Sequence, residues 1–248
     1  MPHISQYELI RNAVVRECLV DMADRDYIAA RLCWRGRLPE QFLWNGLQAL
    51  EKQFKAIVVL NGRSAKGFGH NIEKGLTHVL AIADLKVDPP KVIRDFVKYL
   101  NHHAPNRYLE RPFYLRGAEL FELDRAFWHF RRYCQDFRAT ARYLKKTDAE
   151  WLDMNQQWFT NPSHTRRPYR FRIQGGYLEE TLEGRRGREQ YDALVWKNVY
   201  YGKRDKGKIE FRPLGWSANP AHVRHPNEFA ALVKVMDFPK DVAQALLP

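Results

Sequence analysis

Arg63 and His70 are the residues whose types and spacing most directly indicate chemistry. They lie in one glycine-rich stretch, with six residues between them. A histidine has an ordinary pKa of about 6.5, so His70 could take a proton from a ribose 2′-hydroxyl. The guanidinium of Arg63 could hold the scissile phosphate and stabilise the charge that develops on it. Chemistry of this kind on a phosphodiester would require no metal ion.

The residues around this pair favour contact with an anion. Three glycines between residues 61 and 69 allow tight turns, and Lys66 adds a positive charge. The stretch leads into a predicted helix at about residues 70–83, and a helix N-terminus attracts anions. The alternative is structural: His70 or Asn71 caps that helix and does nothing more.

A second catalytic candidate is the pair Arg125 and His129. The two residues lie one helical turn apart in a predicted helix at about residues 117–136. They are predicted to share a polar stripe with Glu122 and Arg132, opposite the apolar seam of that helix. The alternative is that this stripe faces solvent and only forms ion pairs.

The sequence does not indicate a metal site or a cofactor. His102 and His103 are adjacent, but no carboxylate or cysteine lies at ligand spacing from them. Cys18, Cys33 and Cys134 are far apart and odd in number, which suits a reducing cytosol and gives no disulfide framework. We predict a cytoplasmic protein without metal or cofactor.

The net charge of +12 favours a polyanion as partner, RNA above all. Residues 160–212 hold 13 basic and 7 acidic side chains, which is half of the whole excess. The predicted nucleic-acid-binding residues are Lys66, Arg166, Arg167, Arg170, Arg172, Arg185, Arg186, Arg188, Lys203 and Arg204. Tyr169, Phe171 and Tyr177 lie among them and could stack on bases, or they could face the core of a small sheet.

Helices are predicted to position the residues of the first half. In residues 39–60 the apolar positions recur at alternating spacings of four and three, which is typical of a helix in a bundle. Further helices are predicted at about residues 21–37, 70–83, 91–102 and 117–136. Residues 1–140 are therefore predicted to form a helical bundle domain.

The pattern changes after residue 140. Apolar and polar residues alternate at residues 169–174 and 208–212, which predicts a strand in each, and residues 194–201 are a further strand candidate. A basic turn at residues 202–207 joins the last two strands into a predicted β-hairpin. Short helices are predicted at about residues 227–235 and 240–247. Residues 141–248 are thus predicted to be a small, basic α+β appendage.

The overall composition is that of a globular protein, with 45% hydrophobic and 28% charged residues. No stretch approaches the roughly 20 apolar residues that cross a bilayer, and the first residues do not resemble a secretion signal. We expect no membrane partner.

Three separated segments resemble the HEPN family. They are Asp26–Arg31, Gln48–Ile57 and Gly69–Ile72. In members of the family an alanine-rich helical segment, a helix with the pattern Gln-x-x-Glu-Lys-x-x-Lys-Ala and a histidine that opens the next helix follow in this order. Asn71 stands where members commonly have aspartate. The resemblance covers about residues 20–135, and residues 141–248 resemble no family.

The resemblance implies an up-down bundle of about four or five helices, often as a homodimer. Some members are metal-independent ribonucleases that use an arginine and a histidine a few residues apart. The spacing of Arg63 and His70 fits this pattern, whereas that of Arg125 and His129 is one residue short. Other members bind nucleotides or RNA without catalysis, or bind a separate protein partner. The expected function is therefore RNA-directed, either as an endoribonuclease or as a non-catalytic binding module.

Overall fold

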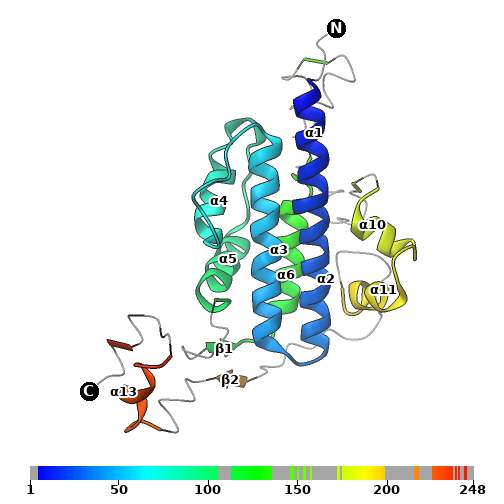
Figure 1. Cartoon of the computed structure of the whole chain (residues 1–248). Coiled ribbons are helices and arrows are strands. Elements are labelled where there is room, and N and C mark those ends of the chain that lie inside the picture. Colours follow the sequence, from blue (N-terminus) through cyan, green and yellow to red (C-terminus); the bar gives the residue numbers. More distant parts are fainter. Residues whose placement is uncertain are drawn as a thin grey trace.

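The structure is a computed structural model that describes most of the first 135 residues and parts of the remainder. The described residues are 5–105, 113–135, 146–147, 150, 153–154, 157, 172–173, 175–198, 215–217, 225–236, 238, 240 and 243–244. The described chain is mainly helical, and its long helices lie side by side in a bundle (Figure 1). The predicted mainly α class is confirmed at this level.

One long helical segment opens the chain. It consists of α1 (Gln6–Val15), a π-helical turn (Arg16–Val20) and α2 (Asp21–Arg35). The helix predicted at residues 21–37 is confirmed as α2, but α1 was not predicted. Most apolar side chains of α1 are exposed to solvent, so α1 has no inward apolar stripe that a periodicity analysis could recognise.

The central helix is α3 (Pro39–Leu60), as predicted from its apolar spacing. Pro39 occupies the first helical position, where a backbone N–H would have no acceptor within the helix. Proline, which lacks this N–H, therefore costs no hydrogen bond there. The predicted seam is buried along its whole length; it comprises Leu43, Leu47, Leu50, Phe54 and Ile57. Three more helices complete the bundle: α4 (Ile72–Leu80), α5 (Lys91–His103) and α6 (Glu119–Arg131).

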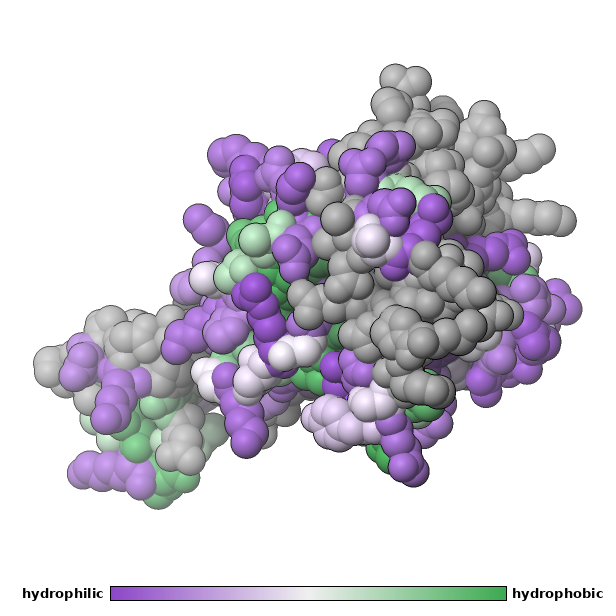
Figure 2. Space-filling view, turned by 90° about the horizontal axis from the view of Figure 1, so that it is seen from above, coloured by the Kyte–Doolittle hydropathy of each residue, from purple (hydrophilic) through white to green (hydrophobic). Residues whose placement is uncertain are grey.

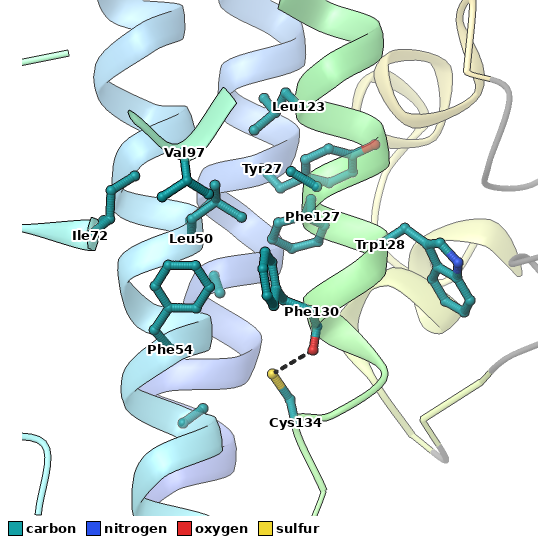
Figure 3. Packing of buried hydrophobic residues seen from close by; sticks show 14 of the residues in the cluster. Tyr27, Leu50, Phe54, Ile72, Val97, Leu123, Phe127, Trp128, Phe130 and Cys134 are labelled. Atoms are coloured by element: carbon teal, nitrogen blue, oxygen red, sulfur yellow. Dashed lines mark hydrogen bonds between the residues drawn. The ribbon is translucent and has the colours of Figure 1, made fainter. Parts of the chain in front are cut away.

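Aromatic side chains of α2, α3 and α6 meet in the core of the bundle (Figure 3). The rings of Tyr27 and Phe127 are stacked with centroids 4.1 Å apart, and Phe54 meets Phe130 edge to face at 4.7 Å. Such contacts contribute about 0.5–1.5 kcal/mol beyond the burial of their surface. Seen from above, hydrophilic residues cover much of the described surface (Figure 2). No helix in the described part of the chain has the length and apolar character needed to cross a bilayer.

The chain beyond residue 140 returns to the bundle at two places. Helices α10 (Tyr177–Leu182) and α11 (Arg188–Val195) pack beside α2, and their buried residues join the same hydrophobic core as the bundle. Strand β1 (Phe113–Leu115) pairs antiparallel with β2 (Gly215–Ser217) (Figure 1). A short helix, α13 (Phe229–Leu232), lies within the helix predicted at residues 227–235.

Two arginines without solvent exposure attach α10 and α11 to the bundle. Arg131 Nη2 lies 2.8 Å from Asp24 Oδ2 and 2.7 Å from Glu179 Oε2, so α6, α2 and α10 meet at one guanidinium. Arg31 Nε donates to the Ala193 carbonyl at 2.9 Å, and the same guanidinium also contacts the Trp196 carbonyl. A cation at these carbonyls stabilises the C-terminal end of α11.

The predicted strand at residues 194–201 is wrong where the structure describes it. Leu194 and Val195 form the last turn of α11, and residues 196–197 form a turn. Residues 172–173 are not in a strand, and the predicted hairpin turn and final strand, residues 202–212, lie outside the described residues.

Candidate functional site

His70 lies against a buried carboxylate on α3. Its Nδ1 is 2.8 Å from Glu51 Oε2 and 3.5 Å from Gln48 Nε2. Glu51 is 3% exposed, whereas the side chain of His70 is 68% exposed. The carboxylate therefore holds one ring nitrogen and leaves Nε2 as the nitrogen that a substrate can reach. This is the arrangement in which a carboxylate orients a catalytic imidazole.

Two lysines of the Gln48–Ile57 segment extend this contact into a network. Lys55 Nζ lies 2.5 Å from the other Glu51 oxygen, and Lys52 Nζ lies 2.5 Å from Asp26 Oδ2 on α2. Burial raises the pKa of Asp26, while its hydrogen bond to Lys52 acts in the opposite direction. The network joins parts of all three HEPN-like segments on one surface of α2 and α3.

The residues next to His70 are anchored on both sides. Phe68 is buried, and its carbonyl accepts the Asn71 N–H at 2.8 Å. Asn71 Oδ1 in turn accepts the Lys74 N–H at 3.0 Å, so Asn71 is the N-cap of α4. The structural alternative, in which a residue only caps the helix, therefore holds for Asn71. His70 does not cap the helix, and its side chain contacts Glu51.

Arg63 does not lie beside His70. Its Nη1 donates to the carbonyl of Ala81, which is the C-cap of α4, at 2.7 Å. His70 precedes the N-cap of the same helix. A helix of nine residues at about 1.5 Å per residue is about 13 Å long, so α4 separates the two side chains. Lys66, which lies between them in the sequence, is exposed.

The second pair lies inside the protein. His129 is 7% exposed and its Nδ1 is 2.9 Å from Arg132 Nη2, while Arg125 is half-buried. Since arginine only donates, Nδ1 accepts and the neutral ring carries its proton on Nε2, for which the described residues provide no hydrogen-bond partner. The polar stripe of α6 is therefore not the solvent-facing one of the alternative, because His129 and Arg132 are buried and Glu122 and Arg125 are half-buried.

We expect the free energy of unfolding to fall as the pH drops below about 6.5. Burial, followed by the charges of Arg132 and Arg125, lowers the pKa of His129 well below its ordinary value, and burial lowers the pKa of His103 to about 4. The unfolded chain therefore binds protons that the native chain does not, and each buried histidine contributes at most about 1.4 kcal/mol per pH unit. Urea unfolding at several pH values measures this slope. His129→Gln should reduce it, and an equal slope in both proteins would contradict the expectation.

The predicted nucleic-acid-binding arginines that the structure describes lie near carboxylates. Arg172 is paired with Glu183, Arg185 with Glu183 and Glu180, Arg186 with Glu180, and Arg188 with Asp192. Residues 172–198 hold five basic and five acidic side chains, so their charges balance. Arg166, Arg167, Arg170, Lys203 and Arg204 lie outside the described residues. The positive excess of residues 160–212 therefore resides in the part that the structure does not describe.

Glu51 is the site residue that the sequence analysis did not select. A signal was present, because Glu51 follows Leu47 by four residues and precedes Phe54 by three. It therefore occupies an inward position of the α3 seam, where a carboxylate requires a partner. The sequence shows this requirement but does not identify His70 as the partner.

No group of three or more histidine, cysteine, aspartate or glutamate side chains among the described residues is arranged to hold a metal ion. Comparison of the chain with family models, curated proteins and solved structures finds no match.

Proposed function

We propose that the chain is an RNA-directed protein of the HEPN type that cleaves RNA without a metal ion at His70. The observation that carries this proposal is the exposed imidazole of His70, held through Nδ1 by the buried carboxylate of Glu51. The resemblance of three segments to the HEPN family supports the same reading, because all three contribute to the polar network around this pair.

In the proposed reaction His70 Nε2 takes the proton of a ribose 2′-hydroxyl. The 2′-oxygen then forms a bond to the adjacent phosphorus, and the bond from phosphorus to the 5′-oxygen breaks. The leaving 5′-oxygen takes a proton from solvent, so the products are a 2′,3′-cyclic phosphate and a 5′-hydroxyl. Glu51 stabilises the imidazolium that forms, and Lys55 adds a positive charge next to the pair.

The test uses the purified full chain with single-stranded and structured RNAs in the presence of EDTA. Cleavage that survives chelation and leaves 2′,3′-cyclic phosphate ends supports the proposal. A matched RNA with one 2′-deoxyribose at the cleaved position should resist at that position, because the nucleophile is missing. Absence of cleavage across varied RNAs, or loss of cleavage in EDTA, would exclude this mechanism.

A second candidate function is a non-catalytic module that binds RNA, a nucleotide or a protein partner. The contact of Arg63 with Ala81 favours it, because the predicted phosphate ligand then lies at the opposite end of α4 from His70. Steeply salt-dependent RNA binding without cleavage would support this candidate. The homodimer that the resemblance implies is compatible with both candidates.

A further inference from the structure

The outer face of α5 is unusually basic. The exposed residues of this helix are Lys91, Arg94, Asp95, Lys98 and His102. Only Asp95 among them is acidic. The neighbouring helix α4 adds exposed Lys74 and His78, and its acid, Glu73, is half-buried and accepts a hydrogen bond from Asn101.

Four of these side chains form a line, which we call the α5 track: Lys91, Arg94, Lys98 and His102. Their spacings of three, four and four residues place them on one side of the helix. At about 1.5 Å per residue, the track is about 17 Å long. It presents a row of cations rather than a single charge.

The track ends next to the His70 site. Asn101, which precedes the last residue of the track, accepts the N–H of Ile72 at 2.9 Å through its Oδ1. Ile72 is the first residue of α4 and lies two positions after His70. A linear ligand on the track would therefore reach the N-terminal end of α4, where His70 lies.

The ion pairs along the track are weak. Lys91 pairs with Asp95 and Arg94 with Asp88, and all four side chains are largely exposed. Exposed pairs contribute about 0–1 kcal/mol, so phosphates can replace these carboxylates. Hydrogen bonding to Lys91, with the charges of Lys91, Lys98 and Arg94, lowers the pKa of Asp95. The lowered pKa is what a locally positive potential produces.

The composition of this face fits a nucleic acid better than a protein. None of the exposed residues of α5 is apolar, whereas the centre of a protein interface is apolar and aromatic. A nucleic acid strand presents a row of phosphates, and lysine and arginine side chains neutralise them with release of counterions. All side chains of the α5 track are basic, as binding to a row of phosphates requires.

We propose that the α5 track binds the phosphate backbone of RNA and leads the strand towards His70. The choice of RNA rests on the proposed function, whereas the contact itself depends only on charge. The ligand is the backbone, so binding should tolerate changes of base sequence.

The test compares K91Q/R94Q/K98Q with the unchanged full chain in binding to a labelled single-stranded RNA over a range of salt concentrations. Each lost phosphate contact should lower the slope of log K against log salt by about 0.7, so the variant should lose about 2. The matched control is R25Q/R35Q/R37Q, which removes the same charge from exposed arginines of α2 and of the turn that follows it. K98Q alone should show about a third of the effect.

The outcomes separate this inference from the proposed function. If the slope of log K against log salt is unchanged in the α5 variant, or falls equally in the control, RNA does not bind to the α5 track. This conclusion holds even if the chain cleaves RNA in EDTA. If the slope falls only in the α5 variant and no RNA is cleaved, the result supports RNA binding by the α5 track and contradicts the proposed cleavage. Single-stranded DNA of the same sequence should lose affinity in parallel. If polyglutamate binding falls and RNA binding does not, the track serves an acidic protein instead.

Discussion

Arg131→Met is expected to lower the free energy of unfolding by about 3–5 kcal/mol and to detach α10 and α11 from the bundle. Arg131 has no solvent exposure, and its guanidinium makes hydrogen bonds of 2.7–2.8 Å to Asp24 and Glu179. Methionine fills similar space but leaves two carboxylates without their cation. An uncompensated buried charge costs far more than an exposed one.

The surroundings of this guanidinium leave little room for relaxation. A Cβ on Gly176 would lie 2.2 Å from Glu179 Oε2 and 2.9 Å from Arg131 Nη2, so any side chain there would displace the ion pair. Asp24 Oδ2 also accepts the Leu178 N–H at 3.3 Å, and Glu179 Oε1 accepts the Ile173 N–H at 3.0 Å. The loss should therefore affect residues 173–182 as a unit.

Urea unfolding measures the loss of stability, and limited proteolysis shows whether residues 175–198 have been released. Arg185→Met is the matched control, because the same substitution there breaks only exposed pairs with Glu183 and Glu180 and should cost at most about 1 kcal/mol. Adding Asp24→Asn and Glu179→Gln to Arg131→Met should recover part of the loss, since the buried charges disappear. A loss below about 1 kcal/mol in Arg131→Met would show that the carboxylates do not depend on Arg131.

His70→Ala should reduce RNA cleavage in EDTA by about 100- to 10,000-fold, the usual contribution of a general base. The side chain is exposed and caps no helix, and Lys55 still pairs with Glu51, so its loss should lower the free energy of unfolding by only about 1 kcal/mol. Initial rates at saturating and limiting RNA separate kcat from KM. The chemical role predicts a fall in kcat, whereas a binding role predicts a rise in KM.

Glu51→Gln tests how His70 is positioned. The amide keeps the shape of the carboxylate but cannot stabilise an imidazolium, so kcat should fall and the pH dependence of cleavage should change. Lys52→Gln is the matched control, because Lys52 belongs to the same network but bonds to Asp26 and Gln48. Equal cleavage by His70→Ala and the unchanged chain would remove His70 from the mechanism. Equal losses in Glu51→Gln and Lys52→Gln would remove the positioning role of Glu51.

Local patterns determined the helices of the first half. The alternating spacing of apolar residues predicted α3 along its whole length, and Pro39 marked its start. The helix predicted at residues 91–102 corresponds to α5, because apolar residues at helical spacing face the core. Helix α1 was not predicted, because most of its apolar residues face solvent and form no stripe towards the core.

The spacing of residues in the sequence did not show which side chains lie close together in the folded chain. Arg63 and His70 have only six residues between them in the chain, yet α4 lies between their side chains because Arg63 bonds to the far end of that helix. His129 was predicted to lie opposite the apolar seam of α6, but His129 and Arg132 on that side are buried as well.

By itself the sequence determined the mainly helical class, the central helices and the segments that resemble the HEPN family. Only the tertiary structure decided that Glu51 holds His70, that Arg63 lies apart from it, and that α10 and α11 join the core of the bundle. The physical reason is that spacing along a helix determines which side a residue occupies. Which residues pack against that side depends on contacts between segments far apart in the sequence, such as those of Arg131 with Asp24 and Glu179.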